Sequence, residues 1–297
     1  MVSNSAFAYH APDAPRGFGT LVQASFALWF ASLRPVLWPA LGYSICSQLP
    51  WLPWWWNTRA RFEHEPLRAW IAPGLFRPDA GVAAFGLAAT IASLLFLLML
   101  LERQGRMARG LAPGAGLGNA ARALPAALLA TLGYLALNFL ALVPVAAAWF
   151  WGVAQDDAFT LLLALFAGLL LAAAPLAWVS VAAGFFYPAI LLDGMGAMAA
   201  LRESVRRVRG YWVLAAGLVS LLLLAFLGIF GTVGAIPLVG AGMAAVWLDG
   251  PEALLRPGWL VWGQLASAPL LALSLPLATA GYVLAWEELG LRRRLVQ

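Results

Sequence analysis

The sequence contains no lysine, and charged side chains of every kind are scarce in it. Only 10% of its 297 residues are charged, whereas soluble domains carry about 25%. All 18 basic residues are arginine. Cys46 is the only cysteine, so the chain has neither an internal disulfide framework nor a cysteine-based metal site. So few charges cannot cover the surface of a soluble protein of this length.

Apolar residues make up 63% of the chain and gather into long uncharged runs. A bilayer core of about 30 Å is crossed by roughly 20 apolar residues in a helix. Six stretches meet this length: 35–56, 81–101, 124–151, 159–192, 211–234 and 259–286. We therefore predict an all-α, polytopic transmembrane bundle. Its single domain covers residues 19–289, between a flexible N-terminal tail at 1–18 and a basic tail at 290–297.

Two of these stretches are longer than one span needs. Residues 159–192 would form a straight helix of about 51 Å, so we expect tilt, protrusion of one end into water, or a kink at Pro175. The apolar run that begins at Tyr211 continues to Leu248 and contains the turn-forming residues Gly231, Gly234 and Pro237. We expect one span to about 234, followed by an interfacial or re-entrant segment through 248.

The distribution of arginine predicts the orientation of the chain. With six spans and a cytoplasmic N-terminus, 13 arginines lie on the inner side and 5 on the outer side. This asymmetry agrees with the positive-inside rule, whereas a seventh span would place residues 292–294 outside. The sequence therefore predicts a bacterial inner-membrane protein with both termini in the cytoplasm. Topology accounts for the basic charge, so we expect lipid and no nucleic acid as its partner.

Three segments on the predicted inner side begin with Gly-x-Gly, at residues 17–19, 116–118 and 194–196. Each is expected to form a short interfacial helix that leads into a span. The third is the most amphipathic: Met198, Leu201, Val205 and Val208 recur at helical spacing, and Arg202, Arg206 and Arg209 share another face. None of the Gly-x-Gly pairs follows a strand, so they are not nucleotide-binding loops.

The stretch AILLDGMGAMAALRESVRRVRGYWVLAAG resembles an element of a bacterial and archaeal membrane family. This family includes the YciC-like inner-membrane proteins and the membrane domain of some glycerophosphodiester phosphodiesterases. The similar positions are the "AL-x-x-S" residues Ala200, Leu201 and Ser204 and the "RG-x-W" segment 209–212, and the segment around Pro144 resembles the third span of the family. The resemblance implies six helices and a cytoplasmic AL-x-x-S helix. The phosphodiesterase domain is absent from this sequence, so that activity is not implied.

Several polar residues are candidates for functional sites. Asn138 and Gln264 are the notable neutral polar residues inside spans, and each is expected to hydrogen-bond across helices, with contact to a substrate as the alternative. The arginines of the third amphipathic segment are candidates for contact with anionic lipid head groups, with topological anchoring as the alternative. These arginines are Arg202, Arg206, Arg207 and Arg209.

The other polar candidates have structural interpretations. Glu63, His64 and Glu65 converge poorly on one ion, and we expect neither a metal nor a cofactor. Asp156-Asp157 is expected to cap a helix. Asp193 is expected to form a cap or turn, or an ion pair with Arg202 or Arg206. Ser204 has no nearby His or Lys that could activate it as a nucleophile.

These features favour a non-catalytic accessory, scaffold or envelope-maintenance protein that contacts lipid or partner proteins. The spans carry almost no ionisable groups, which coupled transporters use to bind ions and relay protons. The alternative is a channel-like or facilitated transporter of a small or lipidic solute. Its path would be shaped by prolines and lined by Asn138 and Gln264; those prolines are Pro144, Pro175, Pro269 and Pro276.

Overall fold

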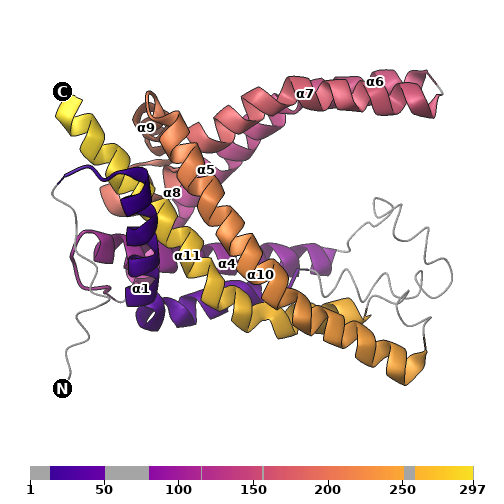
Figure 1. The fold of residues 1–297 in the computed structure, drawn as a ribbon, viewed down its shortest axis with the longest axis horizontal. Helices are drawn as coiled ribbons and strands as arrows, with labels where there is room; N and C mark the ends of the chain where they lie inside the picture. Colours follow the sequence, from indigo (N-terminus) through magenta and orange to yellow (C-terminus); the bar gives the residue numbers. More distant parts are fainter. Residues whose placement is uncertain (1–13, 51–79, 115, 156, 251–257, 297) are drawn as a thin grey trace.

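The computed structural model describes residues 14–50, 80–114, 116–155, 157–250 and 258–296, and this part of the chain is almost entirely helical (Figure 1). No strand occurs in it, so the all-α prediction is confirmed. The helices are α1 (Phe18–Cys46), α4 (Ala80–Ala108), α5 (Leu117–Ala141), α6 (Val143–Ala154), α7 (Ala158–Ala182), α8 (Phe186–Asp193), α9 (Ala197–Val208), α10 (Trp212–Asp249) and α11 (Gly258–Val296).

Six helical stretches in the described part are long and apolar enough to cross a membrane. They are Phe18–Cys46, Ala80–Ala108, Leu117–Ala141, Phe159–Asp193, Trp212–Ile229 and Leu265–Leu295. Their outward faces remain apolar: Phe139 is 68% exposed, Phe159 74% and Val213 79%. Exposed apolar surface of this extent requires a hydrocarbon solvent. The chain is a multi-pass membrane protein.

The start of α1 and the last turns of α11 lie together at one end of the bundle (Figure 1). The backbone N–H of Arg16 donates to Glu288 Oε1 over 2.9 Å, and Arg292 Nη2 donates to the carbonyl of Arg16 over 2.5 Å. We call this end, which carries Arg16, Arg109, Arg207 and Arg292, the arginine-rich end. The basic tail expected at 290–297 is helical through Val296, because Arg292 pairs with Glu288 one turn earlier.

The first span differs from its predicted position. The structure places it in α1, from Phe18 to Cys46, instead of at 35–56, and residues 51–56 lie outside the described part. α1 bends about half-way along (Figure 1), and it contains two prolines, Pro35 and Pro39, residues that commonly kink a helix. Pro39 has no N–H that could donate a hydrogen bond to the carbonyl of Pro35. Arg103 of α4 donates to that carbonyl instead. The helix therefore continues through the bend.

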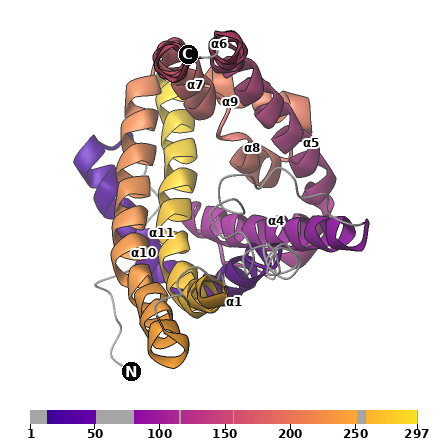
Figure 2. The ribbon, with the colours of Figure 1, turned by 90° about the vertical axis from the view of Figure 1, so that its right-hand side faces the viewer.

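The breaks inside the apolar runs also differ from expectation. The stretch 124–151 divides at Leu142 into α5 and α6, next to Pro144. Conversely, α10 runs unbroken from Trp212 to Asp249, and neither its glycines nor Pro237 ends it. α10 lies beside α11 over much of its length (Figures 1 and 2). Leu238 packs so closely on Gly263 of α11 that a Cβ there would lie 2.9 Å from Leu238 Cα. This packing supports the helix beyond the proline.

The Gly-x-Gly segments mark helix starts, but only one of them begins a separate short helix. Gly17, Gly116 and Gly196 immediately precede α1, α5 and α9. α1 and α5 then continue without interruption into spans, whereas α9 ends after 12 residues. Of the three expected short helices that lead into spans, only α9 is therefore a separate helix.

α6 and α7 form a hairpin that projects from the rest of the bundle in Figure 1 and is seen end-on in Figure 2. Their backbones meet at Gly168, where a Cβ would lie 2.8 Å from Ala148 Cβ and 3.0 Å from the carbonyl oxygen of Pro144.

We predict that Gly168→Leu lowers the free energy of unfolding by about 1–3 kcal/mol, measured by SDS titration in mixed micelles. The control is Gly240→Leu, because a Cβ there meets open space. Equal effects of the two variants would contradict this close approach.

Candidate functional site

Five charged side chains meet at the arginine-rich end and join four helical elements. We call them the ion-pair cluster: Arg109, Asp193, Glu203, Arg207 and Glu287. Arg109, directly after α4, places Nη2 2.7 Å from Asp193 Oδ1 and 2.7 Å from Glu287 Oε1. Its Nη1 donates to the carbonyl of Leu192 over 2.7 Å. One guanidinium thus connects α4 to the end of α8 and to α11.

Arg207 completes the cluster from α9. Its Nη2 lies 2.7 Å from Asp193 Oδ2 and its Nε lies 3.0 Å from Glu203 Oε1. The guanidinium carbon is 3.7 Å from the ring centroid of the buried Trp286, a cation–π contact. Both oxygens of Asp193 are therefore bound, each by a different arginine.

The pKa of Arg109 is set by two opposing effects, burial of its guanidinium and pairing with carboxylates. Burial acts to lower the pKa of its guanidinium. The hydrogen bonds that Arg109 donates to Asp193 and Glu287, and the attraction of their charges, outweigh this effect, so the pKa lies above its ordinary value. The arginine stays charged at every physiological pH. Each carboxylate in the cluster faces a guanidinium, so the arrangement stabilises helix positions and offers no proton-transfer pair.

The structure corrects the predicted surroundings of Asp193 and the predicted faces of α9. Asp193 pairs with Arg109 and Arg207 instead of Arg202 or Arg206, and Arg206 pairs with Glu203. Met198, predicted on the apolar face, is 56% exposed. The buried residues of α9 are Ala197, Ala200, Leu201, Ser204 and Val208, which form its buried stripe, and Glu203, which belongs to the ion-pair cluster. Of the four candidate lipid-binding arginines, Arg207 is turned into the cluster, and Arg202, Arg206 and Arg209 are exposed.

The helix break in the fourth apolar stretch lies at residues 183–185, between α7 and α8, while Pro175 remains inside α7. Two side chains from other helices bind the freed backbone groups. Ser204 of α9 donates to the carbonyl of Ala182 over 2.6 Å and accepts from the N–H of Phe185 over 2.9 Å. Tyr282 of α11 donates to the carbonyl of Gly184. Backbone groups freed inside a membrane protein need such partners. The helical stretch is therefore interrupted here, and a kink at Pro175 was only one of the alternatives expected for its length.

Ser204, for which the sequence predicts no nucleophilic role, holds the two sides of the helix break together. Its side chain is fully buried, and its hydroxyl bonds only to the backbone on both sides of the break. Among the residues that the structure describes, no side chain is placed to take its proton, so its surroundings are those of a structural hydroxyl. The burial of Ser204 could have been predicted from its helical spacing from Ala197, Ala200 and Leu201, which places it on the buried stripe of α9.

Asn138 forms the cross-helix contact expected of it. Ser180 of α7 donates to Asn138 Oδ1 over 2.9 Å, and Asn138 Nδ2 donates to the carbonyl of Tyr134 over 2.8 Å. Nearby, the hydroxyls of Thr131 and Tyr187 are 2.9 Å apart. The amide of Asn138 is thus engaged in packing α5 against α7. Gln264 lies in α11, but its side chain is outside the described part of the chain.

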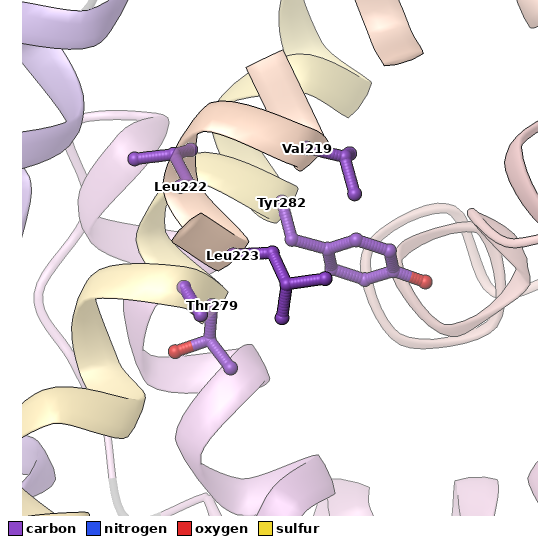
Figure 3. A pocket seen from close by; sticks show the side chains of 6 residues that line it. Val219, Leu222, Leu223, Thr279 and Tyr282 are labelled. Carbon is purple, nitrogen blue, oxygen red and sulfur yellow. The ribbon is translucent and has the colours of Figure 1, made fainter. Parts of the chain in front are cut away.

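An apolar hollow of about 220 Å³ lies between α10 and α11 (Figure 3). Its lining residues are Val219, Leu222, Leu223, Ala278, Thr279 and Tyr282. In Figure 3 the side chains of Leu223, Thr279 and Tyr282 are grouped on its wall. Because Tyr282 also bonds to Gly184, this hollow borders the helix break. Its lining suits hydrocarbon and offers no cluster of polar groups for a soluble substrate.

The remaining candidates divide between the described and undescribed parts. Asp157 caps α7 as expected: its carboxylate accepts from the Thr160 N–H over 2.7 Å. Hydrogen bonds from the Thr160 hydroxyl and N–H lower the pKa of Asp157. Glu63, His64, Glu65 and Asp156 lie outside the described residues. Within the part of the chain that is described, no three His, Cys, Asp or Glu residues are grouped to hold a metal.

Comparisons with known proteins add no relative: no family model, no curated protein and no solved structure matches the chain. The similarity of the AL-x-x-S segment to YciC-like proteins stays a prediction. The candidate site therefore rests on the geometry of the ion-pair cluster, the helix break and α9.

Proposed function

We propose that this chain is a non-catalytic accessory protein of a bacterial inner membrane, with both termini in the cytoplasm, that binds anionic lipid through α9. The two faces of α9 carry the proposal. One face packs into the bundle through Leu201, Ser204 and Val208. The other exposes Arg202, Arg206 and Arg209 at the arginine-rich end. Cytoplasmic leaflets are anionic, and each surface arginine contributes about 1 kcal/mol of attraction.

The polar groups inside the spans support an accessory role over a channel-like or facilitated transporter. Asn138 was the candidate to line a path, and its amide is engaged by Ser180 and Tyr134. The cluster carboxylates are likewise engaged by arginine. A transporter would instead keep polar groups accessible to its solute. Solute uptake into vesicles that contain the purified protein would overturn this ranking.

The lipid-binding role is tested with the protein in discs of phosphatidylcholine doped with phosphatidylglycerol. The triple variant Arg202→Gln, Arg206→Gln and Arg209→Gln should lose most of the enrichment of phosphatidylglycerol around the protein, since it removes about 3 kcal/mol of attraction. The control removes equal charge from the predicted outer loop through Arg59→Gln, Arg61→Gln and Arg68→Gln. Enrichment that survives in the first triple variant, or falls equally in both, would contradict the proposal.

The proposed orientation has its own measurement. Cys46 is the only cysteine, so Cys46→Ala allows single cysteines to be placed at Ser3 or Gln297. Both should react with an impermeant maleimide only after the inner membrane is opened. Labelling of either position in intact spheroplasts would contradict cytoplasmic termini.

A further inference from the structure

A second hollow, of about 560 Å³, lies at the arginine-rich end between α5 and the turn that joins α8 to α9. Its lining residues are Asn119, Arg122, Ala123, Ala126, Ile190, Leu191, Leu192, Gly194, Met195 and Gly196. The four residues from α5 follow helical spacing and form one continuous face. The site is therefore built from the first turns of one span and the end of another.

The lining of the hollow combines apolar and polar residues. Ala123, Ala126, Met195 and the stretch 190–192 supply apolar surface, which we call the apolar wall. Arg122 and Asn119, on the same face of α5, supply the polar side chains. This combination matches a molecule with an apolar chain and a polar, negatively charged head, and it differs from the hollow near Tyr282, which is lined almost wholly by carbon.

Arg122 supplies the positive charge of the hollow. Arg109, Arg207 and Arg292 are bound to carboxylates, whereas Arg122 has no ion pair or hydrogen bond within the described residues. An arginine in a half-apolar hollow that bonds to no protein acceptor is suited to bind a phosphate. Asn119 beside it is fixed, because its Nδ2 donates to Glu102 Oε1 over 2.7 Å.

Two acidic residues lie close to this hollow: Glu102, which accepts the hydrogen bond from Asn119, and Asp193. Asp193 precedes the turn, but Arg109 and Arg207 bind its two oxygens. Gly196, which precedes α9, provides no side chain to cap the first turn of that helix. The first N–H groups of α9 therefore add a partial positive charge on the side that carries Arg122.

We propose that this hollow is a discrete binding site for one anionic phospholipid, with its phosphate on Arg122 and an acyl chain against the apolar wall. The proposal deepens the lipid-binding role given above and rests on it, but it concerns one bound lipid and a different arginine. The shared chemistry is a phosphate ester. The apolar wall and the position at the end of membrane spans favour a lipid over a soluble phosphate.

Native mass spectrometry of the protein released from phosphatidylglycerol-doped discs tests the site. One retained phosphatidylglycerol per chain is expected, and Arg122→Gln should weaken its retention about ten-fold, as expected when a charge-assisted contact is lost. Gly196→Asp should weaken it as well, although aspartate caps α9 and favours its folding. This second variant separates loss of binding from loss of fold.

The arms of the experiment separate this site from the general lipid-binding role. The triple variant of Arg202, Arg206 and Arg209 should keep the single tightly bound lipid while it loses bulk enrichment. Retention unchanged by both Arg122→Gln and Gly196→Asp would overturn the site without touching the role of α9. Displacement of the lipid by millimolar glycerol phosphate would show that phosphate alone is recognised and would overturn the assignment to a lipid.

Discussion

Replacing Ser204 with alanine is expected to lower the free energy of unfolding by about 2–4 kcal/mol, the largest effect of any single hydroxyl in the bundle. The substitution leaves the carbonyl of Ala182 and the N–H of Phe185 without the partner they share. Each buried backbone group without a partner costs about 1–3 kcal/mol. Water cannot readily replace the hydroxyl, because Ser204 is fully buried.

Ser25 provides the matched control for Ser204. It is also fully buried, but its hydroxyl donates only to the carbonyl of Leu21 one turn earlier in α1. That carbonyl keeps its bond within the helix, so Ser25→Ala should change stability by less than about 1 kcal/mol. SDS titration in mixed micelles measures both variants. A cost of Ser204→Ala no larger than that of Ser25→Ala would show that the break does not depend on α9.

The helix break has a second partner that allows a check by double substitution. Tyr282→Phe removes the donor to the carbonyl of Gly184 and leaves the ring stacked on Phe185. Because both side chains bind the same three-residue break, their effects should not be additive. Additive costs in the double variant would indicate that the two bonds act on independent parts of the bundle.

The membrane-spanning character of the fold was predictable because it depends on local properties. A run of about 20 apolar residues has few alternatives to a transmembrane helix, and the six predicted stretches all overlap helices in the structure. Boundaries were less predictable. α1 begins 17 residues before the predicted start at residue 35, because Arg34 and Pro35 indicate a helix start locally, whereas Arg103 of α4 supports the helix through them.

The features of the candidate site depend on contacts between distant parts of the chain. Pro175 was the local signal for a kink, but the break forms where Ser204 and Tyr282 can bind the backbone. Similarly, the sequence suggested an ion pair for Asp193 with nearby arginines. One actual partner, Arg109, lies 84 residues earlier in the chain. A single sequence carries no local signal for either pairing.

The second large effect is expected from Asp193→Asn, which removes the carboxylate shared by two arginines. The side chain keeps its size, but Arg109 and Arg207 both lose an ion pair at 2.7 Å. Breaking a buried pair by removing one partner costs about 3–5 kcal/mol. Asp193 retains 16% exposure and Arg109 retains 32%, and Glu287 and Glu203 still face the arginines. We therefore expect a loss of about 2–4 kcal/mol.

Asp249→Asn is the control for this charge change, because Asp249 is exposed at the end of α10. Its replacement should change the free energy of unfolding by less than about 0.5 kcal/mol. Added salt provides a second test. Surface ion pairs are screened by salt, with a screening length of about 10 Å at 0.1 M. Asp193 is largely buried, so the cost of Asp193→Asn should change little as the salt concentration is raised. A cost below 1 kcal/mol, or one that disappears in salt, would identify the cluster as an ordinary surface network. A large, salt-resistant cost would instead show that α4, α8, α9 and α11 are joined through Asp193, so that α9 presents its arginines from a fixed position.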